Sequence, residues 1–287
     1  MTSQTSEMAF EATVESMLVE GGWHEGDVVE WDVERALFPA RVVMFLRAAQ
    51  PELWGKLASQ HGASLEAMVV DQLVKQLEIK GTLGILRQGF KFQGKTLQMA
   101  YFKPANKLNP DAVAQFELNE LTVTRQVRCH PGKGDAVDMV FALNGVPVAT
   151  CELKNPMTGQ TWRNAIRQYK EDRDPNAPLF KFSKRALVHF AADTDEVHMT
   201  TRLSKSKTRF LPFNRGSAPG DIRCGAGNPE HPSGYRSSYF WQEVLERNRF
   251  LDILGHYVFI ERRDEKVYGE SGARTVRRET LVFPRYH

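Results

Sequence analysis

The stretch AVDMVFALNGVPVATCELK, residues 136–154, decides the fold expected for this chain. It holds two apolar segments in close succession around Asn144-Gly145, a pair of residues typical of a tight hairpin turn. We therefore expect one β-strand over residues 137–143 and a second over residues 147–154.

Three polar residues interrupt these apolar strands: Asp138 in the first, and Glu152 and Lys154 in the second. Side chains alternate along a strand, so Glu152 and Lys154 point to the same face. Burying two carboxylates costs free energy of folding unless a cation neutralises their charge, and Mg²⁺ prefers oxygen ligands. With Lys154 positioning or polarising a water molecule, the arrangement suits phosphodiester hydrolysis. The alternative is an edge-strand ion pair between Glu152 and Lys154, with Asp138 in solvent.

The turn decides whether the two carboxylates can meet. A strict two-residue turn would set Asp138 opposite Cys151, on the wrong face from Glu152. A shared metal ion therefore requires a loop of odd length or a bulge. Gly145 can adopt the left-handed conformation of a three-residue loop with a glycine bulge, and we predict that loop here.

Hydrophobic spacing places the other elements around this pair. The first third is mostly helical, with Ser64 as an N-cap and Gly81 just past a helix end. The middle is rich in β-prone segments, and residues 202–235 resemble a loop. The helices are expected over 6–20, 39–49, from Pro51, 64–79, 162–172 and from about Ser237; the further β segments over 97–103, 121–129, 185–191 and 197–201.

Composition excludes several classes of protein. Of the 287 residues, 41% are hydrophobic and 25% are charged, so the chain can bury a core. No apolar run is long enough for a transmembrane helix, and the N-terminus lacks the pattern of a secretory signal. Three widely spaced cysteines disfavour a zinc ribbon or a disulfide scaffold, and we expect a cytoplasmic protein with no membrane partner. A net charge of +3 does not by itself indicate nucleic acid.

Longer stretches carry a family resemblance. The run from Ala136 to Phe182 resembles the N-terminal nuclease domain of type I restriction enzyme motor (R) subunits, and RALVHFAADTDEVHMTTRLSKSKTRFLPFNRG continues it. GTLGILRQGFKFQG, NELTVTRQVRCHPG and GAGNPEHPSGYRSSYFWQEVL are similar to the same family. The resemblance extends from Phe10-Glu11 to the C-terminus.

The resemblance implies an α/β fold with a restriction-endonuclease-like PD-(D/E)xK core, in which helices flank a mixed central sheet. It implies a nuclease domain over residues 1–260 and a linker over 261–287 that leads towards a helicase-like motor domain missing from this chain. Within the nuclease domain we expect three parts: a helical N-terminal part over about 1–80, a catalytic core over about 81–215, and an irregular loop and helix over about 216–260.

The resemblance also implies roles for individual residues. Asp138 and Glu152 look like metal ligands, the backbone carbonyl of Leu153 is the usual additional ligand, and Lys154 looks like the catalytic lysine. Glu11 matches an acidic position that can reach the metal, although a solvated helix face explains it equally well.

The family also carries a glutamine and a tyrosine on the helix after the ExK strand, here Gln168 and Tyr169. The related RecB-like nucleases space these residues as QxxxY, on one helical face. Here they are adjacent, about 100° apart on a helix, so Gln168 is the better catalytic candidate. Tyr169 can instead pack in the core.

A cationic segment follows the core. Arg202, Lys205, Lys207 and Arg209 can contact DNA phosphates, and Arg167 on the preceding helix can line the same groove. A solvated loop is the competing explanation.

The resemblance implies a Mg²⁺-dependent endonuclease domain, with Mn²⁺ as a substitute, that cuts double-stranded DNA after ATP-driven translocation. Its partners are methyltransferase and specificity subunits. ATP enters only through the motor domains, since no GxxxxGK[ST] phosphate loop occurs in this chain. Two alternatives stay open: a catalytically silent docking module and an end-dependent RecB-like nuclease.

Overall fold

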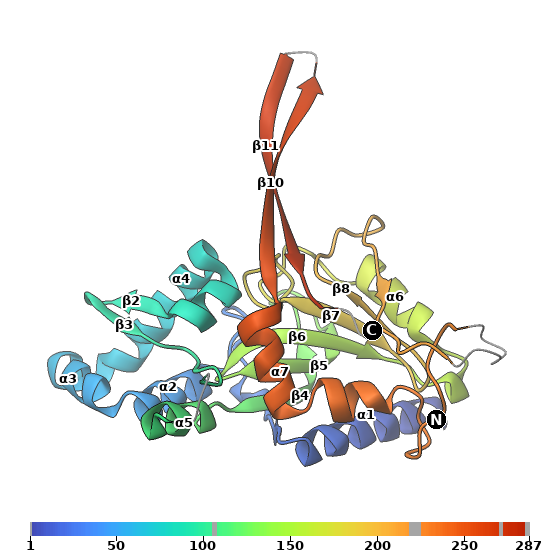
Figure 1. The fold of residues 1–287 in the computed structure, drawn as a ribbon, viewed down its shortest axis with the longest axis horizontal. Helices are drawn as coiled ribbons and strands as arrows, with labels where there is room; N and C mark the ends of the chain where they lie inside the picture. The colour runs from blue at the N-terminus through green and yellow to red at the C-terminus, as the bar shows by residue number, and fades with distance from the viewer. Residues whose placement is uncertain (1, 105–107, 218–224, 270–271, 285–287) are drawn as a thin grey trace.

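A seven-stranded mixed sheet forms the centre of the molecule in the computed structural model, which describes residues 2–104, 108–217, 225–269 and 272–284 (Figure 1). The strand order is β1-β4-β5-β6-β7-β8-β9. β1 runs parallel to β4 and β6 parallel to β7, whereas the other neighbouring pairs are antiparallel. The predicted α/β class with a mixed central sheet is confirmed. The strands are β1 (His24–Glu25), β4 (Leu121–Arg128), β5 (Ala136–Leu143), β6 (Val146–Leu153), β7 (Val188–Ala192), β8 (Val197–Thr200) and β9 (Leu211–Pro212).

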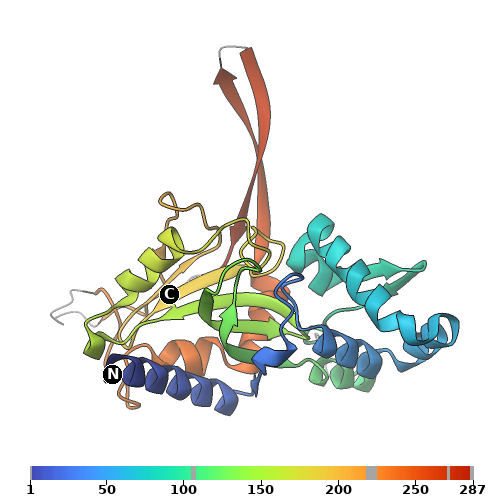
Figure 2. The ribbon, with the colours of Figure 1, turned by 180° about the vertical axis from the view of Figure 1, so that it is seen from behind.

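Helices cover both faces of this sheet. α1 (Thr2–Glu20) and α7 (Arg247–Asp252) lie on one face, and α6 (Trp162–Glu171) lies on the other (Figures 1 and 2). The larger core joins α1 and α7 to the sheet and extends to the helices of the N-terminal half. The smaller core lies between α6 and the sheet. Burial on both faces explains why β5 and β6 are almost continuously apolar.

Four helices that follow α1 in the chain form a lobe beside the sheet, together with the small hairpin β2 (Phe90–Phe92) and β3 (Lys95–Leu97) (Figure 1). Prolines at the first helical position begin several of them, because proline has no N–H to leave unpaired there. These helices are α2 (Pro39–Ala49), α3 (Pro51–His61), α4 (Leu65–Gln88) and α5 (Pro110–Glu117).

Several short helical segments complete the fold. They are 3₁₀ turns at Val28–Glu30, Gly62–Ser64 and Pro156–Thr158, and π-helical turns at Phe240–Val244 and Ile253–Tyr257.

Two local predictions hold in position. Gly81 lies just past the end of a regular helical segment, as predicted, because its backbone is non-helical (φ 75°) at a kink inside α4. Thr82 N–H donates to the Ser183 carbonyl there, and a second helical segment follows the kink. Ser64 occupies the N-cap of α4, but its hydroxyl donates to the His61 carbonyl and does not cap the helix.

The segment expected to be a linker forms part of a long antiparallel hairpin. β10 (Phe259–Gly269) pairs with β11 (Gly272–Val282), and the ribbon projects away from the body (Figure 1). Cross-strand ion pairs such as Arg262–Glu279 and Arg277–Asp264 lie along it. Leu281 and Phe283 return to the larger core and fix its base. Among the described residues, no helix combines the length and apolar composition needed to cross a membrane.

Candidate active site

The hairpin between β5 and β6 sets the register of the candidate site. Leu143 pairs with Val146, so the Asn144-Gly145 turn has two residues, and the predicted three-residue loop is wrong. Asn144 (φ 52°) and Gly145 (φ 82°) are both left-handed, as a type I′ turn requires, and that turn matches the twist of the strands. A Cβ on Gly145 would lie 2.6 Å from the Phe38 carbonyl oxygen.

The bulge that is needed to bring Asp138 opposite Glu152 lies inside β6, and not in the turn. The pairing shifts between Phe141 and Ala142: Ala142 pairs with Pro147, whereas Phe141 pairs with Ala149. Val148 is therefore the additional residue of a bulge. Pro147 has no N–H to donate to the ladder, so a bulge beside it sacrifices little hydrogen bonding.

This shift brings Asp138 into line with Glu152. The ladder ends with Met139 paired to Cys151, and its continuation sets Asp138 against Glu152. At that point Asp138 Oδ2 accepts a hydrogen bond of 2.7 Å from Leu153 N–H. The N–H and C=O of one strand residue point to the same neighbouring strand, so the Leu153 carbonyl projects to the side of Asp138 as well.

Asp138 is turned towards α1. Val137 packs in the smaller core, on the side of α6, whereas Met139 packs in the larger core, on the side of α1. In a regular strand these two residues would share a face, so the backbone is rotated at Asp138. The rotation brings the Asp138 carboxylate to within 3.7 Å of Lys154 Nζ.

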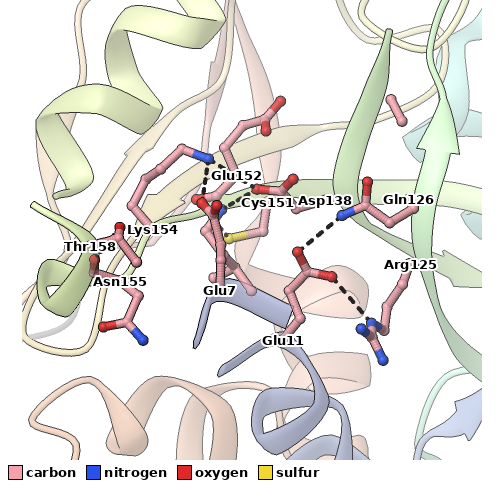
Figure 3. Close-up of polar contacts among 12 residues, drawn as sticks. Glu7, Glu11, Arg125, Gln126, Asp138, Cys151, Glu152, Lys154, Asn155 and Thr158 are labelled. Carbon is pink, nitrogen blue, oxygen red and sulfur yellow. Dashed lines mark hydrogen bonds and ion pairs between the residues drawn. The ribbon is translucent and has the colours of Figure 1, made fainter. Parts of the chain in front are cut away.

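Lys154 lies between two carboxylates. Its Nζ donates to Glu7 Oε1 at 2.8 Å, in addition to its contact with Asp138 (Figure 3). Burial lowers the pKa of Lys154, but the charges of Asp138 and Glu7 outweigh burial and raise the pKa above its usual value. The side chain is therefore an ammonium ion at neutral pH.

Glu152 is fully buried and points its carboxylate away from the contacts of Lys154 with Glu7 and Asp138 (Figure 3). The prediction that Glu152 and Lys154 point to the same face is therefore wrong, because Lys154 lies past the end of β6 and its side chain turns to α1. Arg173, which follows α6, donates from Nε to Glu152 Oε1 at 2.7 Å. Glu152 Oε2 has no partner among the described residues. Burial, and then the charge of Asp138, raise the pKa of Glu152 to about 8.

The first helix supplies two further carboxylates to the same region. Glu11 is almost fully buried and accepts hydrogen bonds from Arg125 Nε at 3.2 Å and Gln126 Nε2 at 3.0 Å. Burial, and then the charge of Asp138, raise the pKa of Glu11. Sequence reasoning missed Glu7, although its spacing of four residues from Glu11 places both on one helical face.

The helix after the ExK strand brings its two candidates to different surroundings. Tyr169 is fully buried in the smaller core, and its hydroxyl shares a 2.8 Å hydrogen bond with the Thr150 hydroxyl. Gln168 is half-buried, and its side chain has no hydrogen bond to the described residues. Arg173 contacts Glu152, a role that the sequence did not indicate.

The predicted DNA-binding residues also separate into two groups. Arg202 stacks its guanidinium 3.7 Å from the centre of the Phe182 ring, and Lys205 Nζ donates to the Arg173 carbonyl at 2.9 Å. All five residues are exposed, but the side chains of Lys207, Arg209 and Arg167 form no hydrogen bond, ion pair or ring contact with the described residues. These three leave their charges available to a phosphate backbone.

The donor set fits a hard divalent cation. The described residues contain no ready-made cage of three or more His, Cys, Asp or Glu side chains. Mg²⁺ does not need one, because it usually keeps several waters and takes one or two carboxylates. The buried, unpartnered Oε2 of Glu152 and the carboxylates of Asp138 and Glu11 are oxygen donors of the required kind. A shared ion also requires the Glu152 side chain to turn from Arg173 towards Asp138.

Comparison with known proteins identifies a family. The profile of a family described as "Type I restriction enzyme R protein N terminus" matches residues 47–208, more than half of the chain. The matched region contains β4 to β8 and α6, and with them Asp138, Glu152 and Lys154. No match was found among curated proteins.

Proposed function

Because the chain belongs to the family of type I restriction enzyme R protein N termini, we propose that it is the Mg²⁺-dependent DNA endonuclease domain of a restriction motor subunit. It hydrolyses DNA phosphodiesters after ATP-driven translocation by the motor domains of the restriction complex. Its partners are double-stranded DNA and the methyltransferase and specificity subunits of the complex. One observation carries the proposal: a register shift sets Asp138 opposite Glu152, whose buried Oε2 has no partner among the described residues.

The chain's own oxygen atoms would hold the ion. Asp138, Glu152 and the carbonyl of Leu153 are the proposed ligands, with Glu11 approaching from α1. Mg²⁺, or Mn²⁺ in its place, would lower the pKa of a bound water and stabilise charge on the phosphate. Since Glu152 is already desolvated, a bound cation would give its Oε2 a partner that the described residues do not provide.

Lys154 acts as a fixed positive charge in this proposal. The ammonium can orient the attacking water and stabilise the negative charge that develops on the phosphate. Glu7 and Asp138 hold it in place for that role.

DNA approaches through its backbone. Lys207, Arg209 and Arg167 would contact phosphates, because their charges are exposed and unpaired within the described residues. Such contacts carry no sequence information, in agreement with recognition by a separate subunit. Binding through them would weaken steeply with salt.

The test is Lys154→Ala in the assembled restriction complex, assayed for nicking of closed circular DNA and for ATP turnover. We expect nicking to be lost while ATP turnover and translocation continue. Lys181→Ala is the matched control, because Lys181 also forms a lysine–glutamate ion pair, at 2.6 Å to Glu78. Nicking by the Lys154 variant at the control's rate would show a docking module, and cleavage of linear DNA alone would show an end-dependent nuclease.

A further inference from the structure

Strand β4 contains a backbone irregularity directly beside the candidate site. Gln126 lies inside the strand with φ 53°, in the left-handed region that residues with a Cβ rarely adopt. Arg125 pairs with Met139 and Val127 with Val137, so Gln126 lies opposite Asp138. The register is the same on both sides of it, which means that the chain rotates here without gaining or losing a residue.

The rotation changes the face of the sheet to which β4 points. Val123 packs in the larger core, on the side of α1, whereas Val127 packs in the smaller core, on the side of α6. An even spacing in a regular strand would keep both on one face. Asp138 on the neighbouring strand shows the same exchange of faces, so the two rotated residues form a matched pair.

The consequence is a double contact with Glu11. Arg125 Nε donates to Glu11 Oε2 and Gln126 Nε2 donates to Glu11 Oε1. Consecutive residues of a regular strand point to opposite faces and could not both reach one carboxylate. The left-handed backbone at Gln126 therefore allows both carboxylate oxygens of Glu11 to be fixed next to Asp138.

Packing does not explain why a glutamine occupies this strained position. Its side chain is largely exposed, beside a surface hollow that is also lined by Glu15 and Arg41. A glycine would adopt the same backbone without strain. Glutamine differs from glycine here by the side-chain amide that contacts Glu11. Strained residues persist only where the surrounding structure holds them, and they cluster at functional sites.

We propose that Gln126 is a positioning residue of the metal site: it holds the Glu11 carboxylate beside Asp138, so that the ion meets a preset oxygen donor. This inference rests on the proposed function, because it assumes that a divalent cation binds at Asp138. Residues that orient metal ligands typically contribute about 10- to 100-fold to metal affinity.

The experiment measures Mn²⁺ affinity of the 287-residue chain by calorimetry, together with its melting temperature. Gln126→Gly keeps the backbone conformation and removes the amide. Gln93→Gly is the matched control: Gln93 is also left-handed (φ 47°) and exposed, but it lies in the turn between β2 and β3. We expect Gln126→Gly to bind Mn²⁺ about tenfold or more weakly, Gln93→Gly to bind as the wild type does, and Gln126→Asn to recover part of the affinity.

Wild-type Mn²⁺ affinity in folded Gln126→Gly would overturn the role of Gln126. If the glycine variant does not fold, Gln126→Met, which keeps the side-chain length without the amide, is judged by the same criterion. Asp138→Asn separates the two proposals. Loss of Mn²⁺ binding in Asp138→Asn with full binding in Gln126→Gly overturns this inference alone, whereas a wild-type chain that binds no Mn²⁺ overturns the metal site and this inference together.

Discussion

The ion pair between Arg173 and Glu152 allows a prediction with a calculable size. The Arg173 side chain is 3% exposed and that of Glu152 is fully buried, with 2.7 Å between Nε and Oε1. Arg173 Nη2 also donates to the Ala136 carbonyl at 2.6 Å. At pH 9, above the pKa of about 8 that Glu152 has in the folded protein, Arg173→Met removes the cation but leaves a carboxylate, and breaking a buried pair in this way costs about 3–5 kcal/mol. At about 2–4 °C per kcal/mol, the melting temperature should fall by about 6–20 °C.

The penalty should depend on pH in a defined direction. Burial raises the pKa of Glu152 to about 8 in the folded protein, above its ordinary value of 4.5. Between these values the folded chain binds a proton that the unfolded chain has lost, so the free energy of unfolding decreases as the pH rises through that window. Without the Arg173 cation the pKa of Glu152 rises further. The deficit of Arg173→Met should therefore be larger at pH 9 than at pH 6.

Urea unfolding followed by circular dichroism at these two pH values measures the penalty. Arg167→Met is the matched control, because Arg167 lies on α6 but is exposed, and its substitution should change stability by less than about 0.5 kcal/mol. Combining Arg173→Met with Glu152→Gln should recover much of the loss, since the partner charge is then absent as well. A penalty below about 1 kcal/mol at pH 9, or one that is equal at both pH values, would refute the assignment of a buried charge pair.

Three further predictions concern Gly145 in the β5–β6 turn, the buried His189, and Tyr169 on α6. Gly145→Ala should lose at least about 1–3 kcal/mol in urea unfolding, because its φ is left-handed and the new Cβ would clash with the Phe38 carbonyl. Burial lowers the pKa of His189 to about 3, so the wild type should lose stability as the pH falls from about 6.5 towards 3, and His189→Gln should lose less in an acid titration followed by circular dichroism. Tyr169→Phe should cost about 1 kcal/mol through the lost hydrogen bond to Thr150 and leave Mn²⁺ affinity unchanged; a tenfold weaker affinity would instead place Tyr169 in the metal site.

The parts of the fold that were predictable from sequence are those with strong local signals. Residues 39–49 form a helix with the predicted bounds, because a proline begins it and apolar residues recur at helical spacing. The two central strands were recognisable from their apolar runs. The β10–β11 hairpin was not, since its charged residues show no apolar alternation and its pairing rests on backbone hydrogen bonds and cross-strand ion pairs.

The candidate site was only partly predictable for a related reason. Spacing selected Asp138, Glu152 and Lys154, and it indicated that a bulge was needed, but it placed the bulge at Gly145 instead of Val148. Glu7 and Arg173 became visible only through tertiary contacts, because each is far in sequence from the side chain it holds.

The motif specifies residue types, but backbone irregularities determine where these residues point. A bulge at Val148 aligns Glu152 with Asp138, and the rotation at Gln126 and Asp138 turns the aspartate towards α1. A chain with the same D…ExK spacing but regular strands would place these carboxylates differently, since a one-residue change of register reverses every side chain of a strand. A catalytic assignment within this fold must therefore rest on the strand register and on the residue opposite the aspartate, as well as on the three-residue motif.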